Sequence, residues 1–462
     1  MVTMKNATIA ALIVAIALVA WWQFGPGRVD PSTPLVERGS GKNLTIAATG
    51  DSLILRALPR NGRDDAFDRV VRIVQSATLG VTNLEQTLLN ESTVPPAPTP
   101  APRWGYGTAR DADSLKRMGF TTVSLANNHT LDYGVDGMKQ TLQILDAAGL
   151  AHAGAGDDLE QARRPVYTGR PGQVVAVISV ATSAAAESRA TLTRGEIRGR
   201  PGVSPLKYEA NVTLDPATFA TLKKAAIASR SPSTEDELTL FGKPIKRGER
   251  TAVDFVPDEQ HVRDVLADIT TARSKADVVV LMIHSHEPNN PDPKPAEFVQ
   301  RFARAAVDAG ATLVVGHGPH QLRGIEIYKG AAIFYSLGNF IFDYGAVDAR
   351  ATDLYDSGID LYRVALGAFD ESRARLEFDA AEWWESVVAV ATFEQGVLTS
   401  IRLEPIDLGV GLPVEKRGTP RSTSAQTGTR ILTRLATLSE PFGTRLQLAN
   451  GTAVVDVPAQ TR

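Results

Sequence analysis

The sequence predicts an α/β protein with a largely parallel sheet. Five short apolar segments end in polar residues, and between them lie stretches whose apolar residues recur at three- and four-residue spacing, as on one face of a helix. Alternation of strands and helices is typical of parallel strands joined by crossover helices. The composition agrees, because 43% of the 462 residues are hydrophobic and 22% are charged, which excludes disorder or a coiled coil for the whole chain.

Charge and cysteine content narrow the classes of function. Forty-nine basic and 52 acidic residues leave a formal charge of −3, so no overall field attracts nucleic acid, and we expect no nucleic-acid partner. An anionic partner would need a local binding site. The chain has no cysteine, which excludes a disulfide framework, a thiol nucleophile and a cysteine-bound metal.

The N-terminus carries an apolar segment that predicts a membrane anchor. Residues 7–24 form a run of 18 residues without a charge, about the minimum length for one membrane-spanning helix. No small-x-small cleavage site follows, and Trp21 and Trp22 suit a membrane interface. We therefore expect residues 1–24 to be an uncleaved anchor with the rest of the chain outside the cytoplasm, joined by a flexible linker over 25–42. The alternative is a cleaved signal segment, which would release a secreted protein.

Strands and helices are placed by the apolar patterns. The predicted strands cover residues 44–48, 79–82, 122–126, 278–283 and 312–315. The predicted helices cover residues 134–148, 259–274 and 294–309. Further β strands are expected late in the chain, over 389–408.

One large domain is expected over residues 43–410. Within it, residues 187–257 are mostly polar and charged and are predicted to be an insertion that shapes one wall of the site. Residues 94–103 contain five prolines and are predicted to be an extended surface loop. Residues 411–462 are assigned to a C-terminal extension with a final helix and strand.

Polar residues at strand ends predict a metal site. Five of the seven histidines lie in three segments directly after predicted strands, and Asp51 and Glu85 follow two others. These histidines are His129, His284, His286, His317 and His320. Because strand ends hold the backbone while the next side chain points into a cleft, groups from several strands can converge. Imidazole, carboxylate and amide oxygen together suit zinc, manganese or iron(II), and a carboxylate can bridge two ions.

Each of these residues also has a plainer interpretation. Asp51 could close a turn or cap a helix, and Glu85 could be a solvated carboxylate at a helix start. Asn127 and Asn128 are common turn residues. His284 is favoured over His286 as a ligand, because the strand is expected to end between them. His152 and His261 are expected to be structural or exposed.

Six motifs then occur in a fixed order along the chain. They are Gly50-Asp51, Asn83-Leu84-Glu85, Ala126-Asn127-Asn128-His129, His284 with Glu287, Gly316-His317-Gly318-Pro319-His320, and Tyr335-Ser336-Leu337-Gly338-Asn339-Phe340. With them, the chain from Leu44 to Leu408 resembles the CapA family of poly-γ-glutamate capsule synthesis proteins. Gly199-Arg200-Pro201-Gly202-Val203 is also similar to the pattern of that family.

The CapA family is similar in turn to the calcineurin-like metallophosphoesterases. The resemblance implies a sandwich of two mixed β sheets flanked by helices, with a site for one or two divalent ions. The implied ligands are Asp51, Glu85 and His320 for one ion, and Glu85, Asn128, His284 and His317 for the other. His129 is implied as the acid that helps a leaving oxygen depart. The chain departs from the phosphoesterases in having Leu53 where they have a histidine and Glu85 where they have aspartate. It departs from CapA relatives in having Ser285 where they commonly have tryptophan and Gly318 where they commonly have a second histidine.

Three functions follow as hypotheses. The first is a membrane-anchored protein that takes part in synthesis or export of a poly-γ-glutamate-type capsule polymer, with other capsule-synthesis membrane proteins and an anionic polymer as partners. The second is a secreted metal-dependent hydrolase of phosphate esters. The third is a non-catalytic scaffold that binds polymer.

Overall fold

The computed structural model describes residues 43–59, 62–90, 94–97, 105–240, 242–343, 378–413 and 416–458. All of these residues belong to one compact unit. The predicted anchor over 1–24, the predicted linker over 25–42 and most of the proline-rich segment lie outside the described residues. Across the ranges that are described, no helix is both long enough and apolar enough to span a membrane.

The larger sheet has ten strands and a parallel half. Its order is β21-β22-β19-β18-β1-β2-β3-β4, with β17 paired to β1 and β20 paired to β19. Strands β1 to β4 and β17 run parallel, whereas β18, β19, β21 and β22 are antiparallel neighbours. The parallel strands are β1 (Leu44–Leu53), β2 (Leu79–Leu84), β3 (Thr122–Ser124), β4 (Ala151–Ala153) and β17 (Asn339–Phe342). The others are β18 (Glu385–Glu394), β19 (Val397–Asp407), β20 (Arg421–Ser422), β21 (Leu446–Ala449) and β22 (Thr452–Val455).

The second sheet has six strands, in the order β15-β16-β14-β13-β7-β6. Its four central strands run parallel, and an antiparallel strand closes each edge. The strands are β6 (Val166–Arg170), β7 (Gln173–Ala181), β13 (Val278–His284), β14 (Leu313–His317), β15 (Ile325–Tyr328) and β16 (Ala331–Phe334). Both sheets are therefore mixed, and the predicted strands form their parallel parts.

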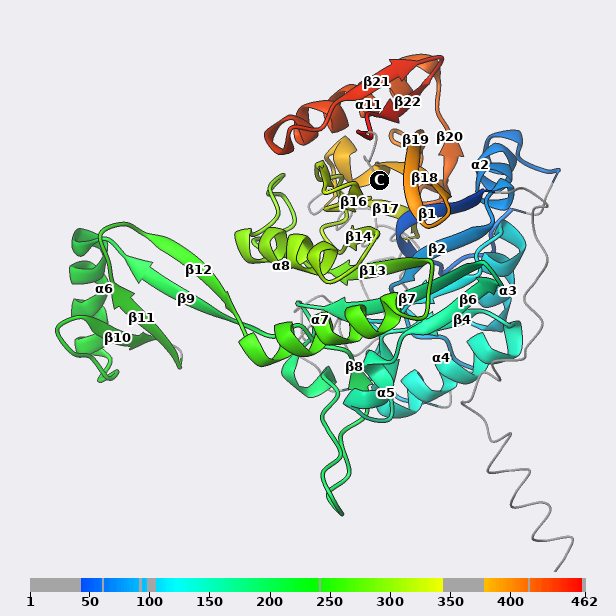
Figure 1. Ribbon diagram of the computed structural model, residues 1–462. Helices are drawn as coiled ribbons and strands as arrows, with labels where there is room; N and C mark the ends of the chain where they lie inside the picture. Colours follow the sequence, from blue (N-terminus) through cyan, green and yellow to red (C-terminus); the bar gives the residue numbers. More distant parts are fainter. Residues whose placement is uncertain are drawn as a thin grey trace, which may run out of the picture. The chain divides into compact units, whose positions relative to one another are not determined.

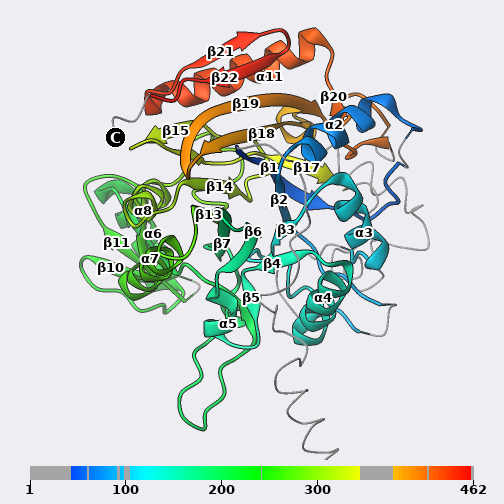
Figure 2. The ribbon, with the colours of Figure 1, turned by 45° about the vertical axis from the view of Figure 1, so that its right-hand side comes forward.

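The two sheets pack face to face, with helices on their outer faces. Side chains alternate along β1, so that Ile46 and Ala48 point into the core between the sheets while Ala47 points to the helices behind. The outer face of the large sheet carries α2 (Asp65–Ser76), α3 (Ala109–Met118) and α4 (Gly134–Ala148). The outer face of the second sheet carries α7 (Glu259–Arg273) and α8 (Glu297–Asp308). Figure 2 shows these two helical layers on opposite sides.

The predicted helices are confirmed to within three residues at each end, and local chemistry explains where they begin and end. Asp258 accepts from the backbone N–H groups of Gln260 and His261 and caps α7. Helix α4 ends at Gly149, whose φ of 64° is a left-handed conformation that glycine adopts at little cost. The α/β class is confirmed as well.

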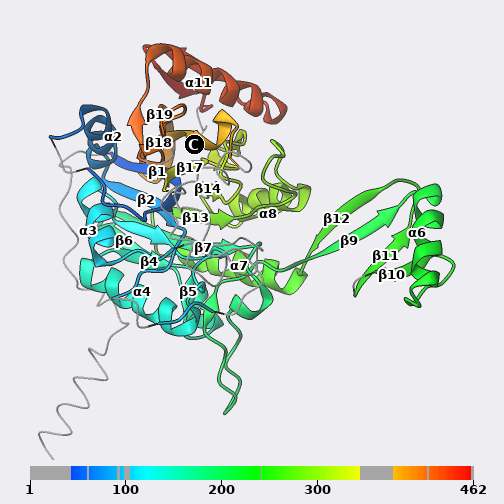
Figure 3. The same cartoon turned by 180° about the vertical axis from the view of Figure 1, so that it is seen from behind.

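The residues predicted as an insertion form a hairpin and a small separate sheet. A short helix, α5 (Leu159–Arg163), lies beside β5 (Ala155–Gly156), which pairs with β8 (Gly202–Val203) at the base of the hairpin. The small sheet has the order β10-β11-β9-β12 and is covered by α6 (Pro216–Ala228). Its strands are β9 (Tyr208–Leu214), β10 (Glu237–Leu240), β11 (Lys243–Arg247) and β12 (Ala252–Pro257). Figures 1 and 3 show it beyond α7 and α8, away from the two large sheets.

The C-terminal residues continue the large sheet. Strands β18 and β19 cover the late β segment that the sequence predicts. Strand β22 pairs with β19, and α11 (Ala425–Ser439) packs Ile431 and Leu435 into the core between the sheets. No structural boundary therefore falls at residue 410.

Candidate metal centre

Ends of parallel strands bring the predicted side chains together. His284 and His317 are paired residues at the ends of β13 and β14, and Asp51 pairs with Asn83 across β1 and β2. Glu85 follows β2 by one residue. Because the carboxyl ends of parallel strands lie at one edge of a sheet, the polar residues of each sheet gather at one edge. The two edges lie next to each other, so these residues form one cluster.

Asp51, His284 and His317 form the first group of candidate metal ligands, which we call group one. The two Nδ1 atoms of His284 and His317 are 3.0 Å apart. Asp51 Oδ1 is 3.8 Å from the first of these nitrogens and 3.7 Å from the second. All three side chains are buried, and the other Asp51 oxygen accepts from the Gly318 N–H at 3.0 Å.

Glu85, His286 and His320 form the second group, which we call group two. Glu85 Oε1 is 3.7 Å from His320 Nε2 and also 3.7 Å from His284 Nε2. His284 Nε2 in turn is 3.0 Å from His286 Nε2 and 2.7 Å from Asn128 Oδ1. The His284 ring thus faces group one through Nδ1 and group two through Nε2, and Glu85 Oε1 lies between the rings of His284 and His320.

The donor set fits divalent ions. Ligand atoms about 2.1 Å from one tetrahedral ion are roughly 3.4 Å apart, close to the separations in both groups. Two buried atoms, Glu85 Oε1 and His317 Nε2, have no hydrogen-bond partner among the described residues. A buried oxygen that accepts no hydrogen bond is costly, and a cation removes that cost. The structure therefore holds two residue groups able to bind divalent metal.

Burial shifts the pKa values of the carboxyl group of Glu85 and of the imidazoles in opposite directions. Burial raises the pKa of Glu85 well above its usual range, and the negative charge of Asp51 adds to this. Burial also lowers the pKa of His284 well below its usual value, and lowers those of His286, His317 and His320 to about 4. The four imidazoles are therefore neutral near pH 7, which leaves a nitrogen lone pair for a metal ion.

Comparison with known proteins places the chain in a family. A family model described as "Bacterial capsule synthesis protein PGA_cap" matches residues 45–344, a range that contains every member of both groups. The chain belongs to this bacterial capsule synthesis family. The resemblance found in the motifs is thereby confirmed.

Relatives of known sequence share most of the chain. An uncharacterised protein of Sinorhizobium fredii, y4uA, is 36% identical over 89% of this chain and 93% of its own. A capsule biosynthesis protein CapA of Bacillus anthracis is 27% identical over 73% of this chain and 68% of its own. A "PGA biosynthesis protein CapA" of Bacillus subtilis is 28% identical over 76% of each chain.

Among solved structures, one similar chain is a 5'-nucleotidase precursor from Thermus thermophilus. Its TM-score is 0.35 at 11% identity, and the match covers 86% of this chain and 58% of the nucleotidase. The chain thus spans less than two thirds of that structure.

The structure divides the predicted ligands differently from the family resemblance. The resemblance pairs Asp51 with Glu85 and His320, whereas the closest clustering joins Asp51 to His284 and His317. His320 still faces Asp51, with Nδ1 at 3.5 Å from Asp51 Oδ2. Leu53 is buried among apolar residues, so the position that carries a histidine in the phosphoesterases supplies no nitrogen ligand here.

His286 belongs to the site, although the sequence favours His284 alone. Strand β13 does end at His284 as expected, but the chain then turns and brings the His286 ring back beside the His284 ring. The His286 N–H donates to Ser183 Oγ at 2.8 Å, which holds this turn. The buried Arg323 donates to the carbonyl oxygens of Glu287 and Asn289 and holds the loop that follows.

His129 lies beside the groups without joining either. Its Nδ1 is 2.9 Å from Asp132 Oδ2, and its Nε2 is 3.9 Å from Glu85 Oε1. Asp132, three residues on, was not singled out from the sequence. This geometry holds the imidazole with Nε2 toward the ligands, where it can hold or deliver a proton.

A set of asparagines supports the ligands and was not predicted. Asn83 donates to Asp51 Oδ1 at 2.8 Å, and Asn127 donates in turn to Asn83 Oδ1 at 3.1 Å. Asn339 Oδ1 is 2.9 Å from His320 Nδ1. The signal was present in the family motifs, because Asn83, Asn127 and Asn339 each lie in one of them.

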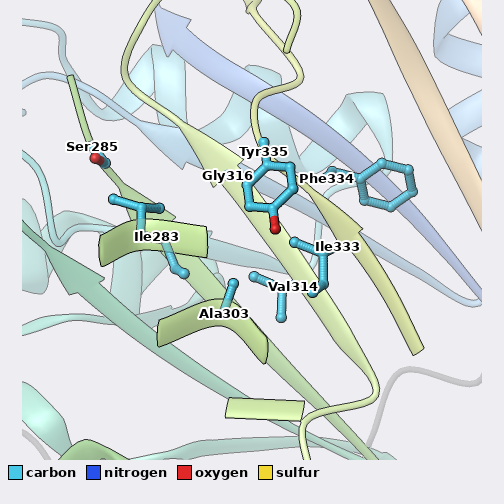
Figure 4. Close-up of a pocket in the computed structure, with 9 residues that line it drawn as sticks. Ile283, Ser285, Ala303, Val314, Gly316, Ile333, Phe334 and Tyr335 are labelled. Atoms are coloured by element: carbon cyan, nitrogen blue, oxygen red, sulfur yellow. The ribbon is translucent and has the colours of Figure 1, made fainter. Parts of the chain in front are cut away.

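A small pocket lies on the other face of the second sheet and is separate from the metal groups (Figure 4). It is lined mostly by apolar side chains, including Ile283, Val314 and Ile333, with Tyr335 at its edge. It contains no member of either group, so the chemistry lies at the strand ends and not in this pocket.

Proposed function

We propose that this protein takes part in synthesis or export of a poly-γ-glutamate-type capsule polymer and binds one or two divalent ions of zinc, manganese or iron at groups one and two. The observation that carries the proposal is Glu85 Oε1, a buried carboxylate oxygen without a hydrogen bond that lies between His284 and His320. It lies inside the segment matched by the capsule synthesis family.

The chemistry of the site follows from its residues. A divalent ion supplies Lewis acidity toward a substrate oxygen when bound. Asp51 and the His284 and His317 rings would hold one ion, and Glu85 with the His286 and His320 rings would hold another. His129, oriented by Asp132, carries a proton at Nε2 toward a leaving oxygen or nitrogen.

The names of relatives support the polymer. Two of them are called capsule or PGA biosynthesis proteins, and a relative from Mycobacterium tuberculosis is called a probable polyglutamine synthesis accessory protein. We extend this role to the present chain, with other capsule-synthesis membrane proteins as its partners.

Complementation with metal analysis tests the proposal. A strain without the gene receives either the wild-type copy or His284→Ala, and surface glutamate polymer is measured together with the metal content of the purified proteins. We expect His284→Ala to lose both metal and polymer. Normal polymer from a metal-free His284→Ala protein would contradict a metal-dependent role.

Hydrolysis of phosphate esters is the second candidate function. The observation that favours it is the His129–Asp132 pair facing Glu85, since such a pair can protonate a leaving oxygen. Turnover of a generic phosphodiester by the wild-type protein, lost in His129→Ala, would support it. Bound metal without phosphodiester turnover would favour the capsule role over phosphate-ester hydrolysis. Absence of metal from every preparation would favour a polymer-binding scaffold.

We also propose that residues 1–24 anchor the chain in the cell membrane, with its bulk outside the cytoplasm. The support is the uncharged run over 7–24. The chain should stay in the membrane fraction and be accessible to protease added outside the cell. Mature protein in the medium that begins between residues 25 and 40 would show instead that the segment is cleaved.

A further inference from the structure

The hairpin between η1 (Ala186–Ser188) and β8 carries an unusual concentration of positive charge. Between residues 186 and 201 the chain has four arginines and two glutamates, against a formal charge of −3 overall. In Figure 1 this hairpin projects from the body next to β8. Two of its arginines, Arg189 and Arg200, lie at its base, and neither makes an ion pair within the described part of the chain.

The base of the hairpin holds these two guanidinium groups in place. Arg189 Nε donates to the Ala184 carbonyl at 2.8 Å. Arg200 Nε donates to the Arg189 carbonyl at 3.0 Å, and its Nη2 donates to the Ala186 carbonyl at 2.7 Å. Each guanidinium is therefore oriented by backbone oxygen and keeps other N–H groups free.

Two glycines make this arrangement fit. A Cβ on Gly202 would lie 2.4 Å from the Ser188 carbonyl oxygen, and one on Gly199 would lie 2.2 Å from that of Thr191. Only glycine allows the two sides of the hairpin to approach this closely. The Gly199-Arg200-Pro201-Gly202 motif thus brings Arg200 against the backbone of Arg189.

The base of the hairpin is joined to group two. Ala184, which accepts from Arg189, follows Ser183, and Ser183 Oγ accepts from the His286 N–H at 2.8 Å. The nearest buried carboxylate, Glu287, already accepts from Ser183, Tyr208 and Ser285. The base of the hairpin is therefore connected through Ala184 and Ser183 to the segment that carries His286, and neither arginine forms an ion pair with a carboxylate among the described residues.

Electrostatics agree with this geometry. Burial lowers the pKa of Arg189, Tyr208 and Glu187 oppose this shift, Arg200 adds to it, and Glu287 opposes it. A bound anion would interact favourably with both guanidinium charges.

We propose that Arg189 and Arg200 form a carboxylate-binding subsite that holds a γ-linked glutamate chain beside groups one and two. The inference rests on the proposed capsule function, and it names the substrate as a polycarboxylate. Each residue of a γ-linked glutamate chain keeps its α-carboxylate free. The planar guanidinium fork matches a carboxylate in a bidentate manner, so two fixed forks suit successive carboxylates of one chain.

Binding of defined oligomers to the full-length protein in detergent tests the subsite. The probes are a fluorescent γ-linked glutamate oligomer, the same oligomer with its α-carboxylates esterified, and inorganic triphosphate. Arg189→Gln and Arg200→Gln should each weaken binding of the free-acid oligomer about tenfold, which corresponds to about 1.4 kcal/mol. Arg189→Lys, which keeps the charge but loses the fork, should lie between wild type and Arg189→Gln. The esterified oligomer should bind weakly to all variants.

The matched control is Arg198→Gln, an equal change of charge at an exposed position of the same hairpin. It should change binding less than twofold. Equal loss in Arg198→Gln, or equal binding of the esterified oligomer, would overturn the proposal. Tighter binding of triphosphate than of the oligomer would overturn the assignment to carboxylate.

Folding and the capsule role are controlled separately. Metal content and the thermal midpoint of each variant should match those of the wild type, and Arg200→Gln carries the test if Arg189→Gln fails to fold, because Arg200 is exposed. Capsule polymer lost in His284→Ala together with unchanged oligomer binding in both arginine variants would refute the subsite alone. Normal polymer in metal-free His284→Ala would refute the metal-dependent role instead.

Discussion

The two large sheets contribute different chemistry to one site. From the large sheet come the candidate oxygen ligands, Asp51 near the end of β1 and Glu85 directly after β2, together with the amide of Asn128 beyond β3. The second sheet contributes four imidazoles, from the last residues of β13 and β14 and from the segments that follow them. His129 and its hydrogen-bond partner Asp132 also lie in the segment after β3 of the large sheet.

This division links metal binding to the packing of the sheets. Neither sheet alone brings oxygen and nitrogen ligands within bonding distance of one ion. The core between the sheets, which includes Ile46, Val81, Val280 and Val315, therefore sets the distances between the two ligand types. Since the carboxylates repel each other and the imidazoles are neutral, a cation stabilises the assembled state.

The largest expected effect comes from the side chain that faces both groups. His284→Ala should remove most of the bound metal, because its two ring nitrogens face group one and group two. His317→Ala should remove less, since it belongs to group one alone. Elemental analysis of the purified proteins measures both. His152→Ala and His261→Ala are the controls, because those histidines lie outside both groups, and equal metal in all variants would refute the site.

A second prediction concerns the carboxylate of Glu85 in group two. Glu85→Gln keeps the size of the side chain but removes its charge, so metal content should fall by about half while group one persists. In the wild type, metal affinity should rise with pH, because the raised pKa of Glu85 means that a proton must leave before the metal binds. This rise should be weaker in Glu85→Gln. The control is Glu326→Gln, which removes a buried carboxylate outside the site. An identical pH dependence of metal affinity in wild type and Glu85→Gln would show that the proton leaves another group.

The third prediction concerns the loss of folding stability at low pH that the buried imidazoles cause. Burial lowers the pKa of His317 and His320 from 6.5 to about 4, so the unfolded chain takes up these protons before the folded chain does. Stability of the metal-free protein should therefore fall as the pH falls from about 6.5 toward 4, by up to roughly 3 kcal/mol for each buried histidine. Urea unfolding at several pH values measures this. His317→Gln should show a smaller loss, and an equal loss would place the acid sensitivity outside the site.

Among the predicted site residues, the smallest expected effect on metal comes from His129, which follows β3 of the large sheet. His129→Ala should keep most of the metal, since this ring belongs to neither group, and should lower function through loss of its proton. The readouts are metal content and capsule polymer in the same preparations and strains. Metal loss equal to that of His284→Ala would make His129 a ligand.

Prediction from the sequence placed a residue correctly where its position depends on its own strand. The strands before Asp51, His284 and His317 are continuous apolar runs, and such runs are placed by local pattern. His286 and Asp132 show the limit, because each reaches the site through a turn. A turn depends on contacts with other elements, such as that between the His286 N–H and Ser183, and these are not visible in a local pattern.

The sequence by itself determined the α/β class, the positions of the site strands and the family, because strand patterns and short motifs are local properties of the chain. Tertiary structure alone decided how the candidate ligands divide into two groups, that Glu85 Oε1 lies between two imidazoles, and that Arg200 lies against the backbone of Arg189. These are distances between residues that are far apart in the chain, from Asp51 to His317 and from Ser183 to His286. Such distances are set by sheet packing and turn geometry, which side chains from the whole molecule determine together.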